Sequence, residues 1–152
     1  MEGLTSEDQT KMDEAKFWNK HRPGFAKHGH FERVENGVAV GTPDVDYCIN
    51  GCHGKIELKY VPTYPARGTT KVFGDRGLRI EQAAWARLRI HHGGRVFVVG
   101  GIGHDFGIWK MDKLLLKVFN DLSKAELKLY AKYFRVGGCM IDYKELAKIL
   151  SE

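Results

Sequence analysis

The sequence predicts an α/β fold in which helices flank a mixed β-sheet. Two observations support this prediction. A helical pattern comes first, and three strand-like segments, a second helical pattern and two more strand-like segments follow it, in the order α-β-β-β-α-β-β. The last part of the chain then returns to short helical patterns. We expect a single domain over residues 1–152, with a core at about 7–110 and a helical C-terminal extension at about 111–152, because this length suffices to bury a hydrophobic core.

The first element is expected to be a helix from about residue 7 to His21. Ser6 and Gln9 have capping-box spacing, which favours a helix start, and Pro23 favours a helix end just before it. The residues that share one face of this helix at helical spacing are Glu14, Phe17, Trp18 and His21.

Strand-like segments follow. Residues 30–40 predict a strand or a bent hairpin, with apolar positions near both ends. Residues 45–49 (VDYCI) and 55–61 (KIELKYV) predict two strands on either side of Asn50-Gly51, a dipeptide that favours a two-residue β-turn. The sequence therefore predicts a hairpin here.

The second half of the core begins with a long loop at residues 62–77, rich in Pro, Gly and basic residues. Loops of this length in compact domains are functional or disordered. A helix is expected over 78–92, with an apolar stripe of Ile80, Ala84 and Leu88, and Gly93-Gly94 should end it. The segments after it predict a buried strand at 95–102, a hairpin partner at 105–111 and two or three short C-terminal helices.

Composition places the chain among ordinary globular proteins. It is 43% hydrophobic and 28% charged, and no apolar run approaches the roughly 20 residues of a membrane span. The N-terminus is polar and acidic, whereas a signal peptide is basic and then apolar. The three cysteines fit thiols in a reducing compartment. We expect a cytoplasmic protein with no membrane partner.

The charge distribution is uneven along the chain. Residues 1–52 contain six Lys or Arg against nine Asp or Glu, whereas residues 53–95 contain nine against three. A basic segment beside an acidic one suits a polyanion held against a carboxylate-bound cation, although a mixed solvated surface would have the same totals.

The predicted hairpin gathers charged residues on one face. Strand alternation puts Glu57 and Lys59 on the same side of their strand. A two-residue turn would place Asp44 opposite Glu57, and a four-residue turn would place Asp46 there instead. Either turn leaves both aspartates on the face of Glu57 and Lys59.

Clustered carboxylates repel one another unless a cation bridges them, and their hard oxygen atoms suit Mg²⁺. Bound Mg²⁺ polarises a phosphate and lowers the pKa of a water, while a nearby ammonium group stabilises developing negative charge. This combination indicates hydrolysis of phosphodiester bonds.

The same residues carry a family resemblance. TPD at 42–44 followed by ELK at 57–59 resembles the motif of the PD-(D/E)xK nuclease superfamily, whose restriction-endonuclease-like core has the order α-β-β-β-α-β. With the helical Glu14, the motif EQAAW at 81–85 and the strand GGRVFVV at 93–99, roughly residues 10–100 resemble its virus-type replication-repair (VRR-NUC) branch. Small stand-alone members of that branch, many from phages, act on branched DNA such as four-way (Holliday) junctions, so the resemblance implies a phage or prokaryotic protein.

The resemblance implies roles for individual residues. Asp44, Glu57 and the Leu58 backbone carbonyl would bind Mg²⁺ or Mn²⁺, with one or two ions per site. Lys59 would position or activate the attacking water. Glu14 would complete a second metal or water site, although it could also be a surface acid at the edge of the apolar stripe. Gln82 would lie near the catalytic lysine, but the long loop before its helix is a departure that leaves its placement open.

Several other residues have competing interpretations. Four basic residues could grip phosphates or merely keep the loop soluble, and we favour phosphate contact: Arg67, Lys71, Arg76 and Arg79. Asp46 is more consistent with a solvated strand-edge acid than with a ligand, and Glu32 and Glu35 rank below Glu14. Cys48, Cys52 and His53 lack a second pair at zinc-ligand spacing. The Gly-rich residues 100–107 precede a strand where a phosphate loop requires a helix, so they favour a hairpin.

Together these observations predict an Mg²⁺- or Mn²⁺-dependent endodeoxyribonuclease, acting on branched or duplex DNA, with a homodimer as a way to pair two cuts. Two alternatives remain open: a catalytically inactive nucleic-acid-binding module on the same fold, and a restriction- or packaging-type nuclease acting on linear duplex.

Overall fold

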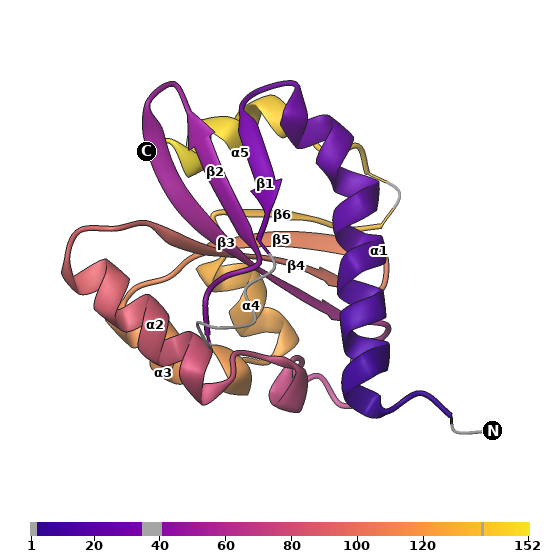
Figure 1. Cartoon of the computed structure of the whole chain (residues 1–152). Coiled ribbons are helices and arrows are strands. Elements are labelled where there is room, and N and C mark those ends of the chain that lie inside the picture. Colours follow the sequence, from indigo (N-terminus) through magenta and orange to yellow (C-terminus); the bar gives the residue numbers. More distant parts are fainter. Residues whose placement is uncertain (1–2, 35–40, 138) are drawn as a thin grey trace.

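The strands form one mixed sheet in the computed structural model of the protein, which describes residues 3–34, 41–137 and 139–152. The six strands of these residues lie side by side in chain order (Figure 1). Their bounds are β1 His30–Arg33, β2 Val45–Ile49, β3 Cys52–Val61, β4 Val96–Ile102, β5 Asp105–Lys110 and β6 Tyr133–Arg135. β3 and β4 pair in parallel, and every other neighbouring pair is antiparallel.

Helices cover both faces of the sheet (Figure 1). Their bounds are α1 Ser6–Ala26, α2 Ile80–His91, α3 Lys113–Val118, α4 Lys124–Tyr130 and α5 Tyr143–Leu150, with short 3₁₀ turns at Gly74–Arg76 and Phe119–Asp121. α1 and α5 pack with one face of the sheet around a core that includes Phe25, Leu58 and Leu146. α2, α3 and α4 pack with the opposite face around Val98 and Trp109. The predicted class, a mixed α/β fold with helical C-terminal elements, is confirmed.

The first helix is longer than predicted. It begins after Thr5, whose hydroxyl accepts a hydrogen bond from the Asp8 N–H, so the capping box is Thr5 and Asp8 and not Ser6 and Gln9. It also continues through Pro23, where the sequence predicted an end. Phe25 is fully buried in the last turn, and this burial of an aromatic side chain offsets part of the cost of the lost proline hydrogen bond.

Two further expectations were wrong. Ile80 and Leu88 of α2 are 87% and 63% exposed, whereas Gln82 and Ala86 lie on the buried face, so the apolar stripe points to solvent. The C-terminal part also contains the strand β6 in addition to helices; its three residues are too few to show a strand alternation in sequence. Part of the segment expected at 30–40 lies outside the described residues, as does Glu35.

The long loop between β3 and α2 is packed against the protein. Val72 and Phe73 are buried, the Phe73 ring packs against Trp109 and Phe119, and the Val72 N–H donates to the Leu122 carbonyl. The loop is therefore an ordered connection that leads into the first turn of α2.

Across the described ranges, no helix combines the length and apolar character required to cross a bilayer.

Candidate active site

The site forms where β2 ends before its neighbour β3. Val45 pairs with Ile56 as the last rung of the ladder, so the following residues of β3 have no β2 partner. The Asp44 side chain replaces the missing β2 partner, because its Oδ2 accepts a hydrogen bond of 2.9 Å from the Leu58 N–H. In an antiparallel pair the N–H and C=O of one residue point to the same neighbour. The Leu58 carbonyl therefore faces the same gap as the Asp44 carboxylate.

The turn resolves the alternative left open by the sequence. Ile49 pairs with Cys52, so Asn50 and Gly51 form a two-residue turn, and both have positive φ values of 49° and 83°. Continuing this register by one residue brings Asp44 opposite Glu57.

Asp46 lies one rung away from this position. It pairs with Lys55, and its Oδ1 is 3.1 Å from the Lys55 ammonium at the half-exposed edge. This placement matches the interpretation of Asp46 as a strand-edge acid.

Three buried side chains form a hydrogen-bonded network beside Asp44. The Lys59 Nζ donates to the Gln82 Oε1 at 2.9 Å, and the Gln82 Nε2 donates to the Glu57 Oε1 at 2.6 Å. The Lys59 Nζ lies 3.7 Å from the same Glu57 oxygen. Gln82 Oε1 also accepts from the Arg79 N–H, which ties the amide to the start of α2. The amide thus fixes the acid and the ammonium relative to each other.

The approach of two segments places Gln82 in this network. Gly41 lies against the first turn of α2 with a positive φ of 88°, and a Cβ there would overlap the Glu81 carbonyl oxygen. A glycine is therefore required for the chain before Asp44 to pass this close to α2.

Glu57 is poorly compensated within the protein. Its Oε2 is buried and has no hydrogen-bond partner among the described residues. Burial raises the pKa of Glu57 well above its ordinary value; the negative charge of Asp44 acts in the same direction, and Lys59 opposes them. A buried, unpaired carboxylate oxygen beside a second acid is what a bound cation would stabilise.

Glu14 reaches the same gap from α1. Its side chain is 8% exposed. Burial raises its pKa to about 7; the charge of Lys59 lowers it, and that of Asp44 raises it. The structure thus brings together the five side chains to which the sequence assigned catalytic or metal-binding roles: Glu14, Asp44, Glu57, Lys59 and Gln82.

A cavity of about 1090 Å³ opens over this group. It is lined by Glu14, Asp44, Lys59 and Gln82, and by cationic side chains that include Arg33, for which no sequence pattern indicated a role. Lys11 also lines it, one helical turn before Glu14, and this i, i+3 spacing is a signal that could have revealed it. The lining thus combines basic side chains with the buried acids, and it also includes two exposed acids, Glu7 and Asp75.

The four basic residues proposed to contact phosphates have different surroundings. Arg79 lines the cavity and lies 3.9 Å from the exposed Glu7 carboxylate. Arg76 also lines it, but its guanidinium is held 3.1 Å from Asp13 and so joins the loop to α1.

The other two lie outside the cavity lining. Lys71 lies 3.8 Å from Asp121 on the surface, and Arg67 is exposed. Arg79 is therefore the best placed of the four for a phosphate in the cavity.

The donor set fits a magnesium ion. No group of three or more His, Cys, Asp and Glu side chains in the described residues forms a ready-made metal cluster. Mg²⁺ does not require one, because it commonly takes one or two carboxylates, waters and substrate phosphate oxygens. Asp44 and Glu57, with the orphaned Oε2 and the Leu58 carbonyl, supply such a partial set. Glu14 offers a further carboxylate.

Cys48 and His53 do not extend to a zinc site. The Cys48 Sγ lies 3.8 Å from the His53 Nε2, but the Cys52 thiol points elsewhere and donates to the Ser151 carbonyl. The Gly-rich segment at 100–107 forms the β4–β5 hairpin, as expected.

The buried Glu14 predicts a pH-dependent stability difference. Its pKa is raised from 4.5 to about 7 in the folded state, so between these values the folded state holds a proton that the unfolded state has lost. This contribution to the free energy of unfolding is present below pH 4.5 and is lost as the pH rises through 7, by up to about 3 kcal/mol. His21, whose pKa burial lowers to about 4, acts in the opposite direction, so the wild-type profile alone is ambiguous.

The variant Glu14→Gln isolates the effect. In urea unfolding with EDTA, we expect Glu14→Gln to gain stability relative to wild type as the pH rises from 5 to 8. Glu7→Gln changes an exposed residue two turns earlier on α1, and its free energy of unfolding should change with pH as that of wild type does. A Glu14→Gln profile parallel to wild type would contradict the assignment of a buried, proton-holding Glu14.

Comparison with known proteins supports the fold. No protein-family model matches the sequence. No curated protein matches it either. Among solved structures, the Holliday junction resolvase Hjc of the archaeal hyperthermophile Archaeoglobus fulgidus matches with a TM-score of 0.50 and 13% sequence identity, over 90% of this chain and 98% of that one. The chain therefore shares the fold of an archaeal Holliday junction resolvase.

Proposed function

We propose that the protein is a metal-dependent endodeoxyribonuclease that hydrolyses phosphodiester bonds in branched DNA. The observation that carries the proposal is the meeting of Asp44, Glu57 and Lys59 under one cavity, with Gln82 bonded to both Glu57 and Lys59. The fold shared with a Holliday junction resolvase supports branched DNA as the substrate class. The motif and the fold together support placement in the PD-(D/E)xK superfamily, and the motif supports its VRR-NUC branch.

The chain's own residues have distinct roles in this proposal. Asp44, Glu57 and the Leu58 carbonyl would hold Mg²⁺ or Mn²⁺, and Glu14 would contribute to a second ion. When bound, such an ion polarises the scissile phosphate and lowers the pKa of a coordinated water. Lys59 holds a positive charge beside the site, where it stabilises charge that develops on the phosphate oxygens and orients the attacking water.

Gln82 acts as a positioning residue. It accepts from Lys59 and donates to Glu57, so it holds the ammonium group and the carboxylate in a fixed relation before the substrate arrives. Preorganised charge of this kind is effective because it requires no rearrangement during the reaction.

DNA would lie against the basic side chains that line the cavity. Arg79 and Arg33 are placed to contact phosphates next to the scissile bond, and Arg67 and Lys71 would contact phosphates farther along the loop. A homodimer would place two such sites for paired cuts on opposing strands. We further propose that residues from about 7 to about 110 form the nuclease core. We also propose that the protein acts in the cytoplasm of a phage-infected or prokaryotic cell.

A cleavage panel tests the function. We expect purified protein with Mg²⁺ or Mn²⁺ to cut four-way junctions or flaps in preference to linear duplex and single strands of the same length, and EDTA to abolish cutting. Preferred cutting of linear duplex would favour a restriction- or packaging-type nuclease. Tight binding without cutting in either metal would favour an inactive DNA-binding module. Neither binding nor cutting of any of the four DNAs would refute the proposal.

A further inference from the structure

A second basic surface lies at the far end of α1 from the active site. Residues 15–31 contain four Lys or Arg and three His but no Asp or Glu, whereas residues 6–14 contain four acids and a single lysine. The acidic half of α1 carries Glu14 at the candidate active site. The basic half borders a separate cavity of about 630 Å³.

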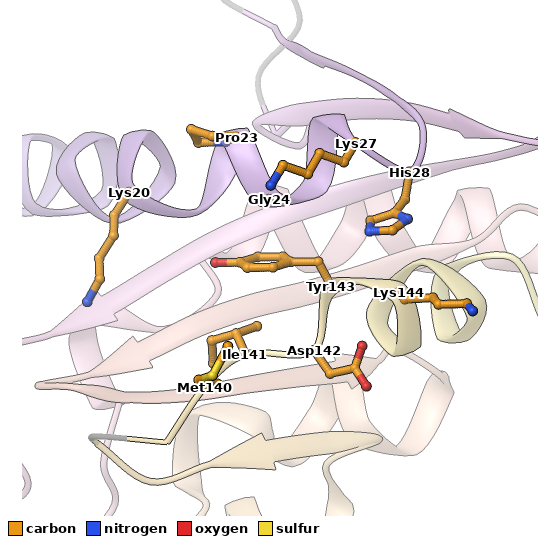
Figure 2. A pocket seen from close by; sticks show the side chains of 10 residues that line it. All are labelled: Lys20, Pro23, Gly24, Lys27, His28, Met140, Ile141, Asp142, Tyr143 and Lys144. Atoms are coloured by element: carbon orange, nitrogen blue, oxygen red, sulfur yellow. The ribbon is translucent and has the colours of Figure 1, made fainter.

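Two elements distant in sequence form this cavity. Lys20 and Lys27 project from α1, and Asp142 and Lys144 come from the start of α5, with the Tyr143 ring between the two segments (Figure 2). The three lysines are exposed and make no salt bridge with any residue that the structure describes. The cavity therefore has three unpaired ammonium groups in its lining.

Helix stability does not account for all of these charges. Lys27, the C-cap of α1, is favourable to its dipole, but Lys144 lies in the first turn of α5, where a cation is unfavourable. The neighbouring carboxylate of Asp142 is used as the helix cap, because it accepts a hydrogen bond from the Glu145 N–H at 3.1 Å. An external anion would compensate the remaining positive charge.

The two walls of the cavity are held together. The Tyr143 hydroxyl and the His21 Nδ1 are 2.8 Å apart and hydrogen-bonded. The Tyr143 ring lies on Gly24, where a Cβ would overlap it. The start of α5 is thus fixed on α1, and the backbone positions of the lysines that line the cavity from both segments are fixed relative to each other.

We propose that this cavity, defined by Lys20, Lys27 and Lys144, binds backbone phosphates of a second stretch of DNA. This inference rests on the proposed function, because that function is the reason for choosing DNA as the ligand. Glu14 and Lys27 are thirteen residues apart on α1, which corresponds to about 20 Å along the helix. This span exceeds the spacing of adjacent phosphates, so the cavity contacts a part of the substrate distinct from the scissile bond. A branched substrate presents a second duplex arm for such a contact.

The test is the salt dependence of DNA binding by the full chain. Fluorescence anisotropy with a labelled four-way junction, in EDTA to prevent cutting, gives Kd at several salt concentrations for wild type and for the double variant Lys27→Ala/Lys144→Ala. We expect the variant to bind more weakly, with its slope of log Kd against log salt reduced by about two, because each lost phosphate contact reduces it by about one. The matched control, Lys113→Ala/Lys117→Ala on α3, should keep the wild-type slope.

The outcomes separate this inference from the function itself. A wild-type slope in Lys27→Ala/Lys144→Ala overturns the inference and leaves the nuclease proposal intact. A reduced slope in a protein that cuts no DNA supports the inference and refutes the nuclease. Wild-type protein that binds no DNA overturns both.

A separate arm tests a small anion as the occupant. If pyrophosphate raises the thermal midpoint of wild type but not of the variant, and the junction slopes are equal, the cavity binds a free phosphate ligand and the DNA assignment is overturned.

Discussion

Replacing Lys59 with alanine should lower the single-turnover rate of DNA cleavage by about 10³-fold, the scale of losing one preorganised charge at a reacting group. Lys59 is 4% exposed, and its ammonium lies at the centre of the Glu57–Gln82 network. DNA binding should persist, because the phosphate contacts assigned to Arg33 and Arg79 are retained. Cleavage of a four-way junction with Mg²⁺, and anisotropy in EDTA, measure the two effects.

Lys55→Ala is the matched control. Lys55 lies on the same strand and face, four residues earlier, but it pairs with Asp46 at 3.1 Å outside the site. Lys55→Ala should therefore cut at the wild-type rate. Undiminished cleavage by Lys59→Ala, or by Glu57→Ala, would remove the basis of the active-site assignment. Equal thermal midpoints of the two lysine variants would exclude unfolding as the cause of lost activity.

Asp44→Asn should have opposite effects on activity and on stability. Cleavage should fall by about 10³-fold, because a carboxylate ligand of the proposed metal is lost. The metal-free protein should become more stable, by about 1 kcal/mol, because the repulsion of Asp44 with the buried Glu57 and Glu14 is removed. For a chain of this length that gain raises the thermal midpoint by about 3 °C. The side-chain amide oxygen that the substitution introduces can still accept from the Leu58 N–H, so the end of β2 is kept.

Thermal unfolding with and without Mg²⁺ tests this prediction. Mg²⁺ should raise the midpoint of wild type, because an ion that binds the folded state stabilises it, and should have little effect on Asp44→Asn. Asp46→Asn is the control, since its carboxylate pairs with Lys55 outside the cavity, and it should keep both cleavage and the Mg²⁺ response. A destabilised Asp44→Asn that still responds to Mg²⁺ would mean that Asp44 serves the hairpin and not a metal.

Strand alternation explains why the core of the site could be predicted from sequence. The placement of Glu57 and Lys59 on one face requires only the two-residue period of a strand. A single turn, Asn50-Gly51, then determines which aspartate lies opposite Glu57, and the structure confirms that its two-residue form is present.

Other features depend on tertiary packing, which local patterns do not contain. Ile80 and Leu88 suggested the buried face of α2, but the buried face contains Gln82, which bonds to polar side chains of β3, and Ala86, which packs in the core. The same limit applies to Pro23, whose helix continues into a last turn in which Phe25 is buried. The basic cavity between α1 and α5 could not be predicted from the sequence either, because these two helices lie more than a hundred residues apart in the chain.

The register of the β2–β3 hairpin has a consequence for how this chain tolerates changes in length. Asp44 and Glu57 meet because the turn between their strands contains two residues. One residue inserted within β2 would rotate Asp44 to the opposite face, into the apolar layer beneath α1, and remove it from Glu57. Exposed loops elsewhere can lengthen with little cost. The spacing of thirteen residues between Asp44 and Glu57 is therefore fixed by the geometry of the catalytic centre. We expect this hairpin to tolerate an insertion only when the pairing of β2 with β3 keeps its register.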